Sequence, residues 1–448
     1  MTSTPATLER REILRLAVPA FLALVAEPLF LLADSAIVGH LGTTPLAGLG
    51  VASAVLLTAA GVFVFLAYGT TSVVARQLGA GSTRGAISAG IDGLWLSVGL
   101  GVVTAVVVAV TAPWLCGRFG ATSEVVEQAA TYLRISAAGI PGMLVVLAVT
   151  GVLRGLQDTR TPLVASVAGF GLNVVLNFFF VFGLHWGIAG SAWGTVIAQT
   201  GMAAGLVVVV IRKALAASAR LRLHAGGLMR AAVGGIPLLV RTLALRAVLL
   251  VTTAAAARYG DATLAGHQIA QTVWTFLAFS LDALAIAAQA LTGAALGRGD
   301  TEGARRTART MTRWGVGAGV VTGVVLLAAS PVIGLAFTSD RSVVDAAAGA
   351  FVVIALTQWL AGYVFVVDGV LMGAGDTVWL AVAMVAAALV WVPALLWAAR
   401  GGTALPGGFG HDLAGLWVWF GAGFMALRAV GLWFRFRGDG WAVTGATR

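Results

Sequence analysis

The chain has 448 residues, of which 59% are hydrophobic and only 10% are charged. Soluble globular domains carry about 25% charged residues, so this composition excludes a water-soluble protein. The formal net charge of +10 fits basic cytoplasmic loops of a membrane protein better than nucleic-acid binding, and the single cysteine, Cys116, excludes an intramolecular disulfide.

Apolar blocks of about twenty or more residues follow one another along the chain, separated by short polar stretches. About 20 helical residues cross the roughly 30 Å hydrocarbon core of a bilayer, where every backbone polar group must be satisfied. The blocks lack the polar–apolar alternation of barrel strands, so we predict helices. The predicted membrane spans are residues 13–38, 47–73, 87–114, 125–153, 160–183, 187–212, 229–257, 264–293, 310–337, 343–373, 377–399 and 412–434.

The first apolar block follows Arg10, Arg11 and Arg15 and so resembles a signal peptide. It is too long for one, contains Glu27 and Asp34, and is followed by further spans. We therefore predict an uncleaved first helix.

Basic residues are distributed unevenly between the two sides of the predicted membrane. The two termini and alternate loops hold twenty arginines and lysines, whereas the opposite loops hold four. Because basic residues concentrate in cytoplasmic loops, we expect a multi-pass protein of the plasma membrane with both termini in the cytoplasm.

Two halves of the sequence match at one fixed offset in residue number. GTTPLAG from Gly42 matches GDATLAG from Gly260, and GVLRGLQDT from Gly151 matches GVLMGAGDT from Gly369, each at an offset of 218. Six spans per half would return the second half to the membrane in the same orientation, so the pseudo-two-fold axis should run along the membrane normal, as in transporters with parallel repeats. The predicted fold is an all-α membrane protein of twelve helices in two six-helix lobes. The expected parts are an N-lobe (1–212), a cytoplasmic linker (213–228) and a C-lobe (229–448).

Polar residues within the N-terminal spans indicate a cation site. Asp34 lies about one turn from the outer end of the first span, and burial there would disfavour its charged form, so that it could bind and release a proton near neutral pH. Asn173 and Asn177 share a helix face at spacing i, i+4 and could form a polar pocket with Asp34 and Thr195. The alternatives are an acid satisfied by neighbouring hydroxyls and asparagines that join helices.

The C-terminal spans also carry polar residues. Arg241 and Asp282 lie at the same predicted depth, about twelve residues from the cytoplasmic ends of their helices, and we expect an ion pair or near-pair there. Asp368 lies near a cytoplasmic helix end, where solvation alone would explain it. The candidate residues for the substrate cavity or its gating are Glu27, Arg241, Gln268, Asp282, Gln289 and Asp368.

Motifs of enzyme chemistry are missing from the sequence. LGAGSTRG and GLGVASAVL lack the GxxxxGK[ST] pattern of a phosphate loop, and no HExxH or paired CxxC motif supports a metal site. GTTSV and similar segments form no nucleophile elbow. We therefore expect neither an enzyme nor a resident cofactor.

Several segments, taken in order, resemble the MATE family, and most of all its subfamily named for DNA-damage-inducible protein F. They are VAEPLFLLADSAIVGHLGTTPLAGLGVA, GVLRGLQDTRTPL, LAGHQIAQTVWTFLAFSLDALAIAAQALTGAALGRGD and FVVDGVLMGAGDT, and the resemblance runs from about residue 10 to about residue 430. It implies two six-helix lobes around a central cavity and export of amphipathic, often cationic compounds in exchange for protons or sodium. By the same resemblance Asp368 matches an acid of the tenth helix in the C-lobe, and Asp282 matches an acid characteristic of this subfamily.

By this resemblance Asp34 matches the acid that couples the cation, while Asn173 and Thr195 match an asparagine and a threonine of the N-lobe site. Asn177 departs from the pattern, because relatives often have an aspartate there. One carboxylate fewer favours protons over sodium as the coupling ion. We expect a monomer that contacts membrane lipid and a small amphipathic substrate.

Two other functions stay open. A flippase for a lipid or lipid-linked precursor would need a cationic cavity, which Arg134, Arg241 and Arg246 could supply. A channel would need a ring of pore-lining residues, and a membrane-embedded enzyme would need a group of reactive residues. The sequence shows neither pattern.

Overall fold

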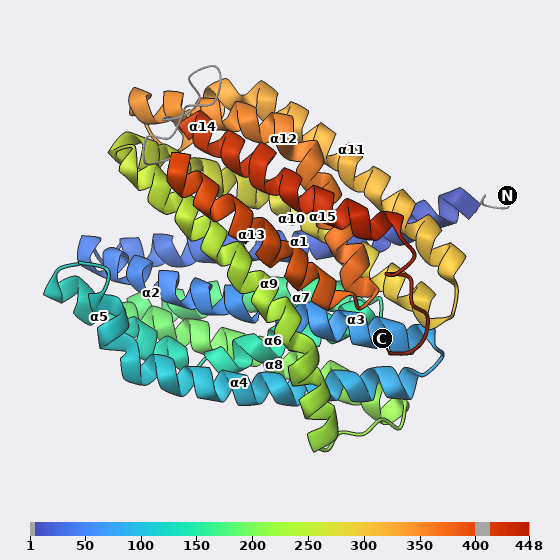
Figure 1. Cartoon of the computed structure of the whole chain (residues 1–448). Coiled ribbons are helices and arrows are strands. Elements are labelled where there is room, and N and C mark those ends of the chain that lie inside the picture. Colours follow the sequence, from blue (N-terminus) through green and yellow to red (C-terminus); the bar gives the residue numbers. More distant parts are fainter. Residues whose placement is uncertain (1–4, 399–412, 448) are drawn as a thin grey trace. The chain divides into compact units, whose positions relative to one another are not determined.

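The computed structural model describes residues 5–398 and 413–447, and for residues 5–10 and Glu27 it describes the backbone only. Every regular element in these ranges is helical (Figure 1). The chain divides into two compact units, Met1–Ile236 and Pro237–Arg448, called here the N-unit and the C-unit. The division falls inside helix α9 (Ala225–Arg258), at its internal proline Pro237.

The N-unit is built from long apolar helices whose sequences provide little amphipathic contrast, because lipid rather than water surrounds them. α3 and α4 each pack along α6, and α7 packs along α8. Its elements are α1 (Pro5–Gly39), α2 (Thr43–Phe63), α3 (Phe65–Gly79), α4 (Thr83–Gly117), α5 (Ser123–Ala137), α6 (Ile140–Gly155), α7 (Arg160–Phe178), the π-helical segment η1 (Phe179–Gly183) and α8 (Gly187–Ala216).

The C-unit centres on α12, which packs against α10, α11 and α14. After the C-terminal part of α9, its elements are α10 (Asp261–Gly297), α11 (Thr301–Ile333), the 3-10 segment η2 (Gly334–Ala336), α12 (Arg341–Gly373), α13 (Thr377–Ala398), α14 (Leu413–Val418), the π-helical segment η3 (Trp419–Phe424) and α15 (Met425–Arg437).

In the described part of the chain, eleven helices or helix pairs are long and apolar enough to cross a membrane. The pair α5 and α6, which bends by 52° where the two helices meet, makes twelve if it counts as one span. Each predicted span overlaps one of these helices, and the predicted ends at residues 399 and 412 lie outside the described residues. The predicted all-α membrane fold is therefore confirmed. The lobe and linker boundaries stay a prediction.

The internal repeat reappears as identical local geometry in the two units. Gly42 and Gly260 precede α2 and α10 with φ of 119° and 104°, a region that favours glycine. A Cβ on Gly151 would lie 2.4 Å from the carbonyl oxygen of Ala67, and a Cβ on Gly369 would lie 2.4 Å from that of Ala285. Ala67 and Ala285 are themselves related by the offset of the repeat. The same close backbone approach thus holds α3 against α6 and α10 against α12.

Candidate cation-coupling site and adjoining cavity

Asp34 of α1 lies inside the N-unit with only 2% of its surface exposed. Its carboxylate accepts hydrogen bonds from the Tyr132 hydroxyl at 2.9 Å, from Nδ2 of Asn177 at 2.8 Å and from the Ser191 hydroxyl. All three donors are neutral, and no arginine or lysine pairs with Asp34 among the residues that the structure describes. The site holds a buried acid without a permanent basic partner.

The two asparagines of α7 connect Asp34 to α8. Asn173 and Asn177 are both fully buried, and Nδ2 of Asn177 also donates to Oδ1 of Asn173 at 3.3 Å. Nδ2 of Asn173 donates in turn to the Thr195 hydroxyl at 3.0 Å. The structure therefore brings Asp34, Asn173, Asn177 and Thr195 into one network, in the grouping that the sequence predicted. Their role in coupling stays a prediction.

The side-chain oxygen of Asn177 is the one atom of this network left unsatisfied. Oδ1 of Asn177 is buried and has no hydrogen-bond partner within the described residues. It lies against Gly194 of α8, where a Cβ would come within 1.9 Å of it. A buried acceptor without a donor is costly, so this oxygen is ready to accept a proton-bearing group or a cation.

Sequence reasoning missed two of the three donors to Asp34. Ser191 lies on α8 one turn before Thr195, and this i, i+4 spacing was the signal that could have found it. Tyr132 lies on α5 and is 2% exposed. No pattern within α5 marks Tyr132 as a partner of Asp34, because the two residues lie 98 positions apart in the sequence.

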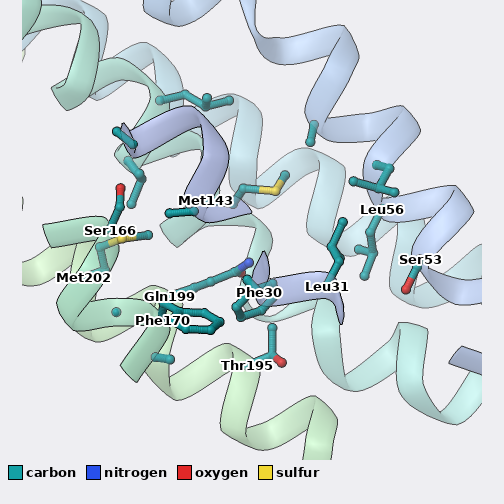
Figure 2. Close-up of a pocket in the computed structure, with 18 of the residues that line it drawn as sticks. Phe30, Leu31, Ser53, Leu56, Met143, Ser166, Phe170, Thr195, Gln199 and Met202 are labelled. Atoms are coloured by element: carbon teal, nitrogen blue, oxygen red, sulfur yellow. The ribbon is translucent and has the colours of Figure 1, made fainter. Parts of the chain in front are cut away.

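A cavity of about 240 Å³ adjoins this network within the N-unit. Tyr132 and Thr195 belong to both, so the cavity and the acid are separated by a single layer of side chains. Figure 2 shows Phe30, Phe170 and Gln199 among the other lining residues. Ligand pockets span about 300–1,000 Å³, so this cavity fits a small ligand or part of a larger one.

The lining of the cavity is mostly apolar, and none of the described side chains that form it is charged. Its polar members are Ser53, Tyr132, Ser166, Thr195 and Gln199. Its apolar members are Ala23, Ala26, Phe30, Leu31, Leu56, Leu57, Ala60, Met143, Val146, Leu147, Gly169, Phe170, Ala198 and Met202. Flexible methionine side chains suit apolar guests of varied shape.

The C-unit buries a different group of charges. Oδ2 of Asp368 on α12 accepts from Nη2 of Arg241 at 2.5 Å and also from Nη2 of Arg428 on α15. Asp368 is only 4% exposed, so the prediction that solvation explains this acid is wrong: α9 and α15 each place an arginine against it. Asp282 of α10 interacts electrostatically with Arg428. The pairing of Arg241 with Asp282 stays a prediction.

The remaining predicted cavity or gating residues are dispersed. Gln268 is exposed and Asp282 is half-buried, whereas Gln289 is 1% exposed where α12 crosses α10. The side chain of Glu27 lies outside the described residues.

Comparison with known proteins agrees with this architecture. The MatE family model matches residues 19–179 and 237–397, two ranges that are related by the offset of the repeat and cover most of the chain. This chain belongs to the MATE family. Members of the family are membrane transporters rather than enzymes, so the predictions of a transporter and of no enzyme activity are both confirmed.

Individual relatives are similar over much of their length. Protein DETOXIFICATION 44, chloroplastic, of Arabidopsis thaliana is 33% identical over 94% of this chain and 81% of its own length. DNA damage-inducible protein F of Escherichia coli is 31% identical over 64% of this chain and 63% of its own. The probable multidrug resistance protein NorM of Thermotoga maritima is 26% identical over 82% of this chain and 81% of its own.

A crystal structure of MATE in the straight conformation shares the fold of this transporter. The TM-score is 0.85 over 99% of this chain and 100% of that one, at 23% sequence identity. At that identity the likeness establishes the fold alone.

Proposed function

We propose that this MATE-family transporter exports small amphipathic, often cationic compounds in exchange for protons, by alternating access, as a single chain in the plasma membrane. The observation that carries the proposal is the buried carboxylate of Asp34, whose described partners are all neutral and which adjoins a mostly apolar cavity with no charge among its described side chains. Relatives named as multidrug resistance proteins support the class of substrate.

The network responds to the protonation state of Asp34. An ionised carboxylate accepts hydrogen bonds only, and its three neighbours all donate to it. A protonated Asp34 is a donor and needs an acceptor. Rotating the Asn177 amide would turn its unsatisfied Oδ1 toward Asp34 and withdraw the Nδ2 donor, so proton uptake would rearrange the contact between α1 and α7.

Such a rearrangement can bias a conformational equilibrium only if the two states bind the proton with different affinity. The proposal therefore requires that only one state hold Asp34 among these three donors. A substrate in the adjoining cavity would contact Tyr132 and Thr195, through which it can sense that state.

The chemistry of the site favours a proton over sodium. Sodium, as a hard cation, prefers several oxygen ligands, and carboxylates supply the charge that holds it. Asp34 is the single carboxylate of the described network, because Asn177 occupies the position where a second one would help. The proton thus remains the proposed coupling ion.

The flippase alternative gains no support from the cavity. A site for an anionic headgroup calls for basic side chains, but the described lining holds no arginine or lysine. Arg134 and Arg246 are exposed, and Arg241 is paired with Asp368. Efflux of amphipathic compounds is therefore the function that we put forward.

The test is flux of a fluorescent cationic dye into proteoliposomes of the purified transporter, under an inside-acid pH gradient and then under a sodium gradient. We expect dye accumulation with the pH gradient and its loss, to the level of protein-free vesicles, in Asp34→Asn. Asp345→Asn, an exposed acid of α12, is the matched control and should transport normally. Accumulation by Asp34→Asn equal to that of the wild type would overturn the coupling assignment, and flux with neither gradient would indicate a facilitator or flippase.

A further inference from the structure

One face of α11 carries three arginines that the transport mechanism does not use. Arg306, Arg309 and Arg313 are spaced i, i+3 and i+7, so their side chains project from the same face of the helix. All three are exposed, and none forms an ion pair or a hydrogen bond with any residue that the structure describes. Glu302 lies one turn further out on this face and leaves it with a net positive charge.

The same face continues directly into an apolar surface. Val320 and Val324 lie below the arginines on it and are 49% and 62% exposed, as expected for side chains in contact with lipid. Residues 314–333 contain no charged residue and form about 30 Å of mostly apolar helix, which matches the hydrocarbon core. Arg313 therefore lies at the edge of the core, with Arg309 and Arg306 about 6 Å and about 10 Å beyond it.

This depth is that of lipid headgroups. The polar region of a bilayer adds about 5–8 Å on each side of the hydrocarbon, so Arg313 and Arg309 reach phosphate groups and Arg306 lies at their outer margin. The distribution of basic loops assigns this end of α11 to the cytoplasm, where anionic lipids attract basic segments.

The internal repeat provides a comparison inside the same molecule. The offset of 218 places Arg306, Arg309 and Arg313 opposite Ser88, Ile91 and Trp95 of α4.

On α4 the chain itself covers part of the equivalent face, although Trp95 is still 41% exposed. The Arg220 backbone N–H donates to the Ser88 hydroxyl, Nε1 of Trp95 donates to the carbonyl oxygen of Leu221, and Arg220 pairs with Asp92 at 3.0 Å. On α11 no described segment lies where the segment around Arg220 lies on α4. Arginines stand at the positions of the neutral residues Ser88, Ile91 and Trp95.

We propose that Arg306, Arg309 and Arg313 bind the headgroup of an anionic phospholipid, whose acyl chains lie along Val320 and Val324. The lipid fills on α11 the place that the segment around Arg220 fills on α4. Its phosphate would neutralise the guanidinium groups, which suit phosphate geometry through bidentate hydrogen bonds. This site is independent of the proposed coupling at Asp34.

The test compares lipid binding by the purified full-length transporter in neutral detergent. Dioleoylphosphatidylglycerol and dioleoylphosphatidylcholine are titrated separately, and bound lipid is counted by native mass spectrometry alongside the thermal unfolding midpoint. We expect the wild type to prefer phosphatidylglycerol, and the triple variant R306Q/R309Q/R313Q to need about tenfold more of it for the same occupancy.

Three controls make the result specific. R84Q/R212Q/R222Q removes the same charge from exposed arginines on α4, α8 and the loop after α8, and should bind as the wild type does. R306K/R309K/R313K keeps the charge and should retain most of the binding. Glycerol 3-phosphate, which lacks acyl chains, should not raise the unfolding midpoint.

The proposal is overturned by equal phosphatidylglycerol binding in the wild type and R306Q/R309Q/R313Q. It is equally overturned if phosphatidylcholine binds as well as phosphatidylglycerol, or if R84Q/R212Q/R222Q loses as much binding as the α11 variant. Stabilisation by glycerol 3-phosphate would assign the arginines to a soluble phosphate instead of a lipid.

Discussion

At the scale of single residues, the N-unit and the C-unit bury acids in opposite surroundings. Asp34 has three neutral donors, whereas Asp368 lies between two arginines. The sequence was enough to group Asp34 with the asparagines of α7, because a charge within a span needs polar neighbours. It was not enough to find Arg428, which lies far beyond Asp368 in the chain, on the last span.

The neutral surroundings of Asp34 lead to a prediction for Asn177→Asp. A second carboxylate beside Asp34 would add charge and oxygen ligands, so we expect sodium to bind at least about tenfold more tightly than in the wild type. Flux in proteoliposomes under a sodium gradient measures the gain, with Asn177→Ser as the uncharged control. If Asn177→Asp remains indifferent to sodium, the missing carboxylate does not explain ion choice.

The paired surroundings of Asp368 predict a loss of stability in Asp368→Asn. Removing the carboxylate leaves Arg241 and Arg428 buried together without a counter-charge on α12, which should cost about 3–5 kcal/mol. The midpoint of thermal unfolding in detergent reports the change. Asp345→Asn removes an exposed acid from the same helix and should leave the midpoint unchanged. An unchanged midpoint in Asp368→Asn as well would mean that the arginines find other compensation.

At the scale of elements, counting depth along the sequence assumes the constant rise of an ideal α-helix. The last span contains the π-helical segment η3, which shifts the residues after it relative to the constant rise of an uninterrupted α-helix. A depth counted along an ideal helix would therefore not apply to residues after η3, such as Arg428.

Helix contacts through glycine predict the effect of Gly151→Ala. Its Cβ would meet the carbonyl oxygen of Ala67 at 2.4 Å and Oγ1 of Thr70 at 2.0 Å, and backbone cannot yield as a flexible side chain does. We expect a destabilisation of about 1–3 kcal/mol, seen as a lower unfolding midpoint. Gly171→Ala of α7, where a Cβ meets nothing within 4 Å, should be neutral or slightly stabilising. Equal midpoints for the two variants would show that α3 and α6 separate at little cost.

At the scale of the whole molecule, composition and the repeat were enough to predict an all-α membrane fold whose spans match the eleven apolar helices and the bent pair α5 and α6. The length of an apolar stretch decides whether it can span a membrane, so the helices could be predicted without knowing which helices they pack against. The chemistry of the sites needed the structure, because residues such as Asp34, Tyr132 and Ser191 meet across large separations in sequence.

The predicted sidedness can be tested by cysteine labelling. Cys116 is fully buried, so the wild type should give little background with a membrane-impermeant maleimide. In intact cells we expect labelling of Ser123→Cys, at the first residue of α5. We expect labelling of Thr83→Cys, at the first residue of α4, only after permeabilisation. The reverse pattern of labelling would show that the orientation in the membrane is opposite to the predicted one, with the arginines of α11 outside the cytoplasm.

Tyr132 lines the cavity and also contacts Asp34, but its hydroxyl group can donate only one hydrogen bond. That hydrogen now points at Asp34, so a guest that drew it away would leave the ionised carboxylate with two donors instead of three. The substrate and the ionised carboxylate of Asp34 would then compete for one hydrogen bond from Tyr132. By reciprocity, substrate binding would disfavour the ionised form of Asp34, and ionisation of Asp34 would weaken substrate binding, without any helix having to move.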